Sequence, residues 1–346
     1  MRHFRRHVVL GSAVTAMLFA GLPAVAGPAI AITQLPTLPG GDFSSASAVN
    51  DVGTVAGSSN TATTNSIAVT WSPNGTITAL GTLPGATWST ANAINDAGTV
   101  VGYAITAAGS DQAVKWSPGG VATALPSLHA GDLTFANGIN DNGAIVGQEI
   151  ISGTMEFHAI RWNPDGTITD LGTGPFNQGD PIAINDSGTA VGGSTAVDQN
   201  GARAVRWAHN GTITVLPQLP GAASQDSTAS DINDSGVVAG SSVTTNRHQY
   251  EAVRWSKQGV LTALGQLAGG IDSSAAAIND NGVIVGDGLD ANSVDQAIRW
   301  GANGAMTELP TLSGTTDPTP AGLNDNGVIV GTVRLASGQP AAVRWH

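Results

Sequence analysis

The chain has 346 residues, of which 11% are charged and 5% aromatic, and its formal net charge is −12. It contains 46 Gly, 17 Pro and no Cys. The lack of Cys excludes disulfides, thiol catalysis and Cys-ligated metal centres. The acidic balance argues against nucleic acid or an anionic membrane as a partner, since both bind basic patches.

The N-terminal residues have the organisation of an export signal. A positive segment with three Arg precedes an uncharged apolar stretch, Val8 to Ala20, and Ala24-Val25-Ala26 offers small residues to a signal peptidase. We therefore predict a signal peptide over residues 1–26 and a secreted or periplasmic location for residues 27–346. The apolar stretch is short for a membrane anchor, so no membrane insertion is expected. The Arg5-Arg6 pair leaves both general and twin-arginine export open.

After residue 26 the chain repeats one unit seven times. A tetrad, Asn-Asp-x-Gly, recurs every 45 to 48 residues, and it begins at Asn50, Asn95, Asn140, Asn185, Asn233, Asn279 and Asn324. A second marker ends in Trp and recurs at Trp71, Trp116, Trp162, Trp207, Trp255, Trp300 and Trp345. Of the eight Trp, only Trp88 lies outside this register. A repeat of this length is typical of solenoids and β-propellers.

Each unit predicts four short strands and no helix. The first strand ends at the tetrad, whose closing Gly fits the left-handed position of a tight turn. The second strand is a Gly-Thr-Val-Val-Gly type of run, the third ends at the repeated Trp, and the fourth is a Thr-Ile-Thr-x-Leu type of run. The repeated Val-x-Trp residues point to one side of the third strand and should pack between units. A Pro- and Gly-rich segment, called the link below, leads to the next unit.

The two ends of the chain indicate closure. Residues 31–40 resemble a fourth strand with no unit before it, and residues 342–346 resemble a third strand with nothing after it. Together they complete one unit, so we expect residues 31–38 to pair with residues 341–345, which removes free sheet edges. We predict an all-β fold over residues 27–346, a single seven-bladed β-propeller of four-stranded blades whose N-terminal strand completes the last blade. An open β-solenoid is the alternative.

The units resemble the HAF repeats of bacterial extracellular proteins. The segment His158-Ala159-Ile160-Arg161-Trp162 is similar to the His-Ala-Phe motif that gives this family its name, although Val or Ile replaces Phe in all seven copies. The Ala-Ile-Asn-Asp-x-Gly and Leu-Gly-x-Leu-Pro-Gly runs match its other landmarks, and the likeness covers essentially all of residues 27–346. The resemblance implies secretion and a repeat fold. It carries over no catalytic residue, cofactor or substrate.

Two charged features of the repeat are expected to be structural. Each tetrad offers one Asp, which is too few oxygen ligands for a calcium loop, so we assign it to turn formation and predict no metal site. A basic residue precedes six of the seven repeated Trp, and we expect it to form a salt bridge with a tetrad Asp on the same face. These residues are Lys115, Arg161, Arg206, Arg254, Arg299 and Arg344.

Six links carry an Asp five to eight residues before the tetrad, at Asp42, Asp132, Asp180, Asp226, Asp272 and Asp317. In a propeller the links surround the central opening on the face opposite the tetrads. The six Asp residues therefore predict an acidic rim suited to a cation, a cationic peptide or sugar hydroxyls. The alternative is that each Asp only caps its own turn. Asp231 stands where other units have Ala or Gly, and we expect it to face the channel or a neighbouring link.

Recognition needs a surface that differs between units, and only the link face offers one. Trp88 lies in the one link without an Asp, where it can stack on a sugar ring or plug the space under the loop. The long loop between the second and third strands of the fifth unit carries Arg247 and Tyr250. We predict that a ligand contacts the Asp rim, Trp88, Arg247 and Tyr250.

These features favour a secreted, monomeric, non-enzymatic protein that binds a glycan, a peptide or a surface protein and uses no cofactor. The His and Glu residues form no catalytic motif that we recognise. One alternative is a secreted enzyme, a hydrolase or lyase, that acts on polysaccharide with two of the rim carboxylates. The other is a structural component of an envelope or matrix.

Overall fold

The computed structural model describes residues 30–63, 66–154, 156–195, 201–224, 226–246 and 249–346. The predicted signal peptide and Arg247 lie outside the described residues. Within them the chain forms strands β1 to β28 and one 3-10 turn, η1 (Gly174–Phe176), which confirms the all-β prediction. In this part of the chain no helix is long and apolar enough to cross a membrane.

The strands fall into four classes by their position in the repeat. First strands are β2 (Ser44–Val49), β6 (Trp88–Ile94), β10 (Leu133–Ile139), β14 (Gln178–Ile184), β18 (Ser227–Ile232), β22 (Ser273–Ile278) and β26 (Thr316–Leu323). Second strands are β3 (Val55–Ser59), β7 (Val100–Ile105), β11 (Ile145–Ile150), β15 (Ala190–Thr195), β19 (Val238–Val243), β23 (Ile284–Leu289) and β27 (Ile329–Arg334). Third strands are β4 (Ile67–Trp71), β8 (Asp111–Trp116), β12 (Phe157–Trp162), β16 (Ala202–Trp207), β20 (Tyr250–Trp255), β24 (Asp295–Trp300) and β28 (Pro340–Trp345). Fourth strands are β5 (Ile77–Ala79), β9 (Ala122–Ala124), β13 (Ile168–Gly172), β17 (Ile213–Val215), β21 (Leu261–Ala263), β25 (Met306–Glu308) and β1 (Ile32–Gln34).

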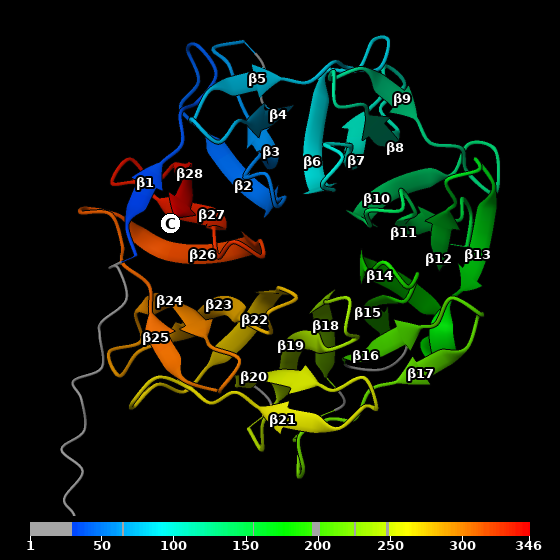
Figure 1. Cartoon of the computed structure of the whole chain (residues 1–346). Coiled ribbons are helices and arrows are strands. Elements are labelled where there is room, and N and C mark those ends of the chain that lie inside the picture. Colours follow the sequence, from blue (N-terminus) through cyan, green and yellow to red (C-terminus); the bar gives the residue numbers. More distant parts are fainter. Residues whose placement is uncertain (1–29, 64–65, 155, 196–200, 225, 247–248) are drawn as a thin grey trace, which may run out of the picture.

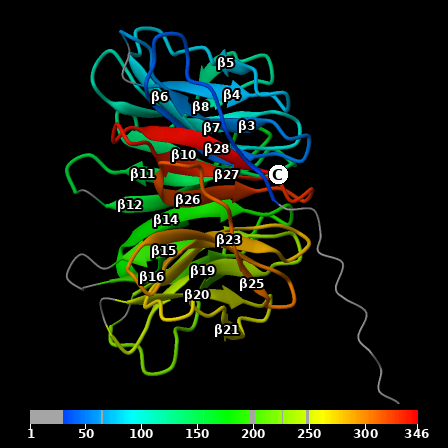
Figure 2. The ribbon, with the colours of Figure 1, turned by 90° about the vertical axis from the view of Figure 1, so that its left-hand side faces the viewer.

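Each unit forms an antiparallel group of four strands, which follow each other in chain order in six groups, while the seventh consists of β26, β27, β28 and β1. A single parallel bridge between Phe157 and Gln178 joins two of these groups into one larger sheet. The groups surround a central axis with the first strands innermost (Figure 1), and β26, β27 and β28 lie side by side in the view of Figure 2. The two ends of the described chain pair as expected. β1 runs antiparallel to β28, with Ile32 opposite Trp345 and Gln34 opposite Val343.

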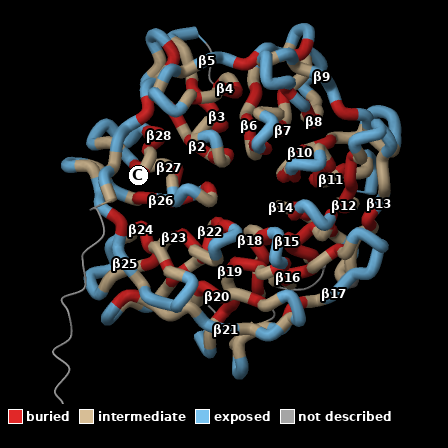
Figure 3. The backbone as a smooth tube through the Cα atoms, in the orientation of Figure 1, coloured by how far each residue is buried: buried red, intermediate tan, exposed pale blue. Residues whose placement is uncertain are grey.

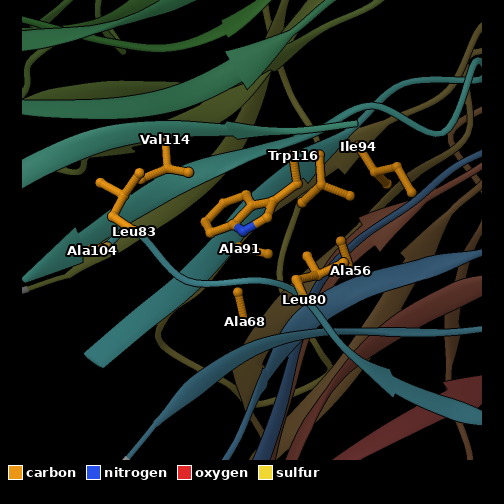
Figure 4. Close-up of a cluster of buried hydrophobic side chains, with 10 residues drawn as sticks. Ala56, Ala68, Leu80, Leu83, Ala91, Ile94, Ala104, Val114 and Trp116 are labelled. Carbon is orange, nitrogen blue, oxygen red and sulfur yellow. The ribbon is translucent and has the colours of Figure 1, made fainter. Parts of the chain in front are cut away.

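The repeated Trp residues form the core between neighbouring groups. Figure 4 shows Trp116 enclosed by side chains of its own unit and of the preceding one, including Ala56, Leu80 and Val114. All seven repeated Trp are at most 3% exposed. Buried residues are concentrated in the strands, and the residues of the links and turns are more exposed (Figure 3). The predicted packing of Val-x-Trp between units is confirmed.

Most of these Trp side chains also hold a link in place. The indole N–H donates to a backbone carbonyl of the preceding link at 2.6–2.8 Å, in the pairs Trp71 with Pro36, Trp116 with Gly81, Trp162 with Pro126, Trp255 with Pro217 and Trp345 with Pro310. The side chain therefore fills the space between two sheets and satisfies a carbonyl of the non-repetitive segment. In these five units the dual contact favours Trp over another large apolar residue, whereas the indole N–H groups of Trp207 and Trp300 have no hydrogen-bond partner among the described residues.

Candidate functional site

The seven tetrads gather at one end of the central axis and are joined in a ring. Each tetrad Asn is buried, and its Nδ2 donates to the backbone carbonyl of the next unit's tetrad Asn at 2.9–3.1 Å. Its Oδ1 accepts the backbone N–H four residues later, which closes its own turn. The closing Gly has φ between 73° and 83° in all seven tetrads, as expected for a left-handed position.

The tetrad Asp residues form a second ring. The backbone N–H of each donates to Oδ1 of the next at 2.7–2.9 Å, from Asp51 through Asp325 and back to Asp51. The ring lines a polar hollow of about 220 Å³. Burial and the charges of neighbouring ring carboxylates raise the pKa values of Asp96 and Asp280. Each tetrad Asp therefore binds the adjacent unit, whereas the predicted closure of its own turn is made by the tetrad Asn.

The predicted salt bridges between the basic residues and the tetrad Asp residues are wrong. Arg344 donates to the backbone carbonyls of Pro73 (2.7 Å), Gly53 (3.2 Å) and Ser72 (3.3 Å), which belong to turns of the adjacent unit. Arg206 binds the carbonyls of Lys257, Gly236 and Ser256, and Arg254 binds that of Ala302. Within the described residues no ion pair joins any of the six cations to a tetrad Asp. The arginines do lie on the face that carries the tetrads, as expected. They bind carbonyls there because the tetrad Asp carboxylates already accept hydrogen bonds from each other's backbone N–H groups.

Three link Asp residues bind the start or end of a neighbouring strand in their own unit. Asp42 accepts from Asn60 Nδ2 at 2.7 Å, Asp317 pairs with Arg334 Nε at 2.8 Å, and Asp226 accepts a hydrogen bond from the Tyr250 hydroxyl. The bond to Asp226 is the main cause that raises the pKa of Tyr250 to about 12. The Tyr250 hydroxyl is therefore held by the Asp226 carboxylate of the same unit.

The other three link Asp residues have different surroundings. Asp180 accepts from Asn137 Nδ2 at 3.2 Å, and burial raises its pKa to about 6. Burial is the main cause that raises the pKa of Asp272, and the negative charge of Asp295 raises it further. Asp132 Oδ1 accepts the backbone N–H of Ser152 at 2.8 Å, and this bond is the main cause that lowers its pKa. Two of the six, Asp226 and Asp272, both bind Tyr250, through its hydroxyl and its backbone N–H respectively. None of the six lines the described wall of the central channel.

Asp231 does line the central channel, a cavity of about 530 Å³. Its carboxylate accepts the backbone N–H of Ile232 and that of Ile278 in the adjacent inner strand, both at 2.8 Å. Burial raises the pKa of Asp231 to about 7 despite these two bonds. Asp231 therefore faces the channel, which is one of the two expected positions, and it binds an inner strand of the neighbouring unit and not a link.

Trp88 begins the inner strand β6 and belongs to an aromatic row. Its ring lies 5.1 Å from that of Tyr103 at 43°, and Tyr103 lies 4.8 Å from Phe135 in an edge-to-face arrangement. All three are half-buried. Trp88 also lines a cavity of about 610 Å³ between the first two units, the Trp88 pocket, with Thr63, Ser66, Ile67, Thr82, Ala86, Thr87, Ser89 and Ile105. Sequence reasoning identified Trp88 but missed the aromatic row and the pocket, because Tyr103 and Phe135 follow no repeated pattern.

The fold is similar to that of solved propeller proteins, while the sequence matches no family model and no curated protein. A streptogramin B lyase structure aligns with a TM-score of 0.59 and 16% identity over 92% of this chain and 97% of that one. Virginiamycin B lyase from Staphylococcus aureus aligns at 0.58 and 15%, over 91% and 98%. The β-propeller domain of the Trilobed protease from Pyrococcus furiosus, described as an open velcro topology, aligns at 0.55 and 9%, over 88% and 96%. At these identities the similarity establishes a propeller-like all-β fold.

Proposed function

We propose that residues 27–346 form an exported, closed, seven-bladed propeller that binds a neutral carbohydrate in the Trp88 pocket. The seven groups of four strands and the pairing of β1 with β28 support the blade count and the closure. The hydrogen bond from Asn324 to Asn50 supports closure independently at the channel. The N-terminal sequence and the resemblance to HAF repeats support export.

The single observation that carries the binding function is the lining of the Trp88 pocket. It combines one half-buried indole with the hydroxyl-bearing residues Thr63, Ser66, Thr82, Thr87 and Ser89, and no described lining residue is charged. An aromatic face packs against the apolar face of a pyranose ring, and hydroxyls exchange hydrogen bonds with sugar hydroxyls. A cationic peptide has no counter-charge in this lining, so the geometry favours a neutral sugar over the peptide ligand.

The same lining favours binding over hydrolysis. Glycoside hydrolysis needs two carboxyl groups beside the scissile bond, and none is among the described residues around the Trp88 pocket. Asp132 and Glu149 have closely spaced carboxylates outside the lining of the Trp88 pocket, but Glu149 is fully buried and cannot contact a polysaccharide. The proposed protein is therefore a carbohydrate-binding module built on a whole propeller.

A glycan array with the chain from residue 27 tests this function. We expect saturable binding to neutral oligosaccharides and at least a tenfold loss of affinity in Trp88→Ala, since stacking and apolar contact on an indole contribute on the order of 1–3 kcal/mol. Asn210→Ala is the control, because Asn210 is exposed in a turn between third and fourth strands. Binding confined to charged peptides, or lost only in the control, contradicts the proposal.

A further inference from the structure

Three potential metal ligands converge in the third unit, outside the Trp88 pocket. They are His129 Nδ1, a carboxylate oxygen of Asp132 and a carboxylate oxygen of Glu149, and all lie within 4.8 Å of one another. His129 Nδ1 is 3.1 Å from Glu149 Oε1 and 3.6 Å from Asp132 Oδ2. Ligands placed about 2.1 Å from a tetrahedral ion are separated by about 3.4 Å, and His129 Nδ1 lies close to this distance from an oxygen of each carboxylate.

Two of these residues depart from the repeat. Glu149 lies nine residues after its tetrad Asn, where three other units have Ser59, Ser194 and Ser242. Ser59 Oγ accepts the backbone N–H of Leu38 at 2.9 Å, and Glu149 accepts the equivalent N–H of Leu128 at 2.7 Å. A hydroxyl is therefore sufficient to hold the link. The carboxylate of Glu149 adds a charge that the fold does not need.

His129 is the second departure. It directly follows the Leu that is held in this way, a position where Pro39, Pro84 and Pro220 stand in other units. Its side chain is 61% exposed, so one side of the cluster is open to solvent. Five other links also carry an Asp, but among the described residues only Asp132 lies beside a His and a buried Glu.

The charge balance of the cluster is incomplete. The Glu149 side chain is 0% exposed and that of Asp132 is 5% exposed. Asp132 Oδ2 is buried without a hydrogen-bond partner, although Oδ1 accepts from Ser152. Two buried carboxylates are costly unless cations balance them, and one exposed imidazole supplies at most a single charge. A divalent ion between the three ligand atoms would balance both carboxylates and engage Asp132 Oδ2.

We propose that His129, Asp132 and Glu149 bind one divalent transition-metal ion of the Zn²⁺ type. An imidazole with two carboxylates suits zinc and its neighbours in the first transition series, whereas Ca²⁺ prefers six to eight oxygens. The backbone N–H groups of His129 and Ser152 donate to the ligating carboxylates and hold them in position, as outer-shell groups do in metal sites. The exposed side of His129 leaves a fourth position for water.

Isothermal titration of the metal-free chain from residue 27 with Zn²⁺ tests the site. We expect one equivalent to bind, with affinity at least tenfold lower in Asp132→Asn and in Glu149→Ser. Glu149→Ser restores the residue that other units use, so the link keeps its hydrogen bond. Asp42→Asn is the matched control, because Asp42 occupies the equivalent link position without a His or a buried Glu nearby, and it should bind Zn²⁺ like the wild type.

X-ray absorption of the Zn²⁺-loaded wild type gives a test that needs no variant. We expect a first shell of nitrogen and oxygen at about 2.0–2.1 Å that includes one imidazole. A wild type that binds less than one equivalent at micromolar Zn²⁺, or variants that bind as tightly as the wild type, would overturn the proposal. A first shell with two or more imidazoles would overturn it as well.

Discussion

Asn324 donates from Nδ2 to the backbone carbonyl of Asn50 at 2.9 Å, across 274 residues of sequence. Beside this bond, the backbone N–H of Asp325 donates to Asp51 Oδ1 at 2.8 Å. The last and first tetrads are thus joined in the same way as tetrads that follow each other in the chain. The two bonds complete both rings, and they support the closed propeller that we propose.

The ring of tetrad Asn residues predicts that replacing one of them by Ala lowers the free energy of unfolding strongly. Asn140→Ala removes the bond to the Asn185 carbonyl and leaves the backbone N–H of Ala144 without its acceptor. Both groups are buried, so we expect the free energy of unfolding to fall by about 3 kcal/mol. Asn142→Ala in the same turn removes an exposed bond to the Asp186 carbonyl and should cost less than about 1 kcal/mol. Denaturant titrations of the two variants compare these values, and equal costs would show that the ring adds no stability.

Closure predicts that the first strand stabilises the last unit. A chain that begins at Gly41 loses the pairing of β1 with β28, the buried side chains of Leu35 and Leu38, and the Pro36 carbonyl that accepts from Trp71. We expect a loss of several kcal/mol compared with a chain that begins at residue 27. Thermal unfolding measures the difference. An unchanged melting temperature would mean that the pairing of the two ends does not stabilise the fold.

The arginine contacts predict that Lys is a poor replacement. Arg344 uses two guanidinium nitrogens on three carbonyls of the adjacent unit, and a single ammonium group cannot reach all three. We expect Arg344→Lys to lower the free energy of unfolding by about 1–2 kcal/mol. Lys115, the exposed residue at the equivalent position of the second unit, supplies the control Lys115→Met. A control that destabilises as much as Arg344→Lys would contradict this role.

Asp231 predicts a pH dependence of stability. Its pKa is raised to about 7 in the folded chain, above the value of about 3.9 for an exposed Asp. The protonated folded state is therefore favoured at low pH, and this contribution is lost as the pH rises from about 4 through 7. Relative to Asp231→Ala, the wild type should lose roughly 2–4 kcal/mol of stability over that range. Paired denaturant titrations at several pH values measure the difference, and parallel curves for the two proteins would refute it.

The features that depend on a single repeat unit could be predicted from the sequence. The strand positions, the left-handed Gly of the tetrads and the packing of Trp116 and its equivalents follow from spacing and residue type. Contacts between units were harder to predict, because the radial arrangement decides which turn meets which side chain. Arg344 was placed near a tetrad correctly, but its carbonyl partners depend on the Asp ring that occupies the carboxylates.

The proposed metal site at His129, Asp132 and Glu149 could not be predicted from the sequence either. His129 and Glu149 are 20 residues apart in sequence and match no ligand motif. A comparison of each unit with the others contains the signal, since His129 stands where three other units have Pro and Glu149 where three other units have Ser. Their proximity still depends on the fold, because the link must return along the end of β11. The aromatic row of Trp88, Tyr103 and Phe135 was missed for the same reason.

Selective quenching of Trp88 tests the proposed carbohydrate site most directly. The seven repeated Trp are at most 3% exposed and Trp88 is half-buried, so acrylamide should quench mainly Trp88. We predict that the neutral oligosaccharide that binds best on the array protects this fluorescence with a saturable dose response, and that Trp88→Ala loses both the quenching and the protection. Unchanged quenching at saturating sugar, or an array with no neutral glycan bound, would contradict the account.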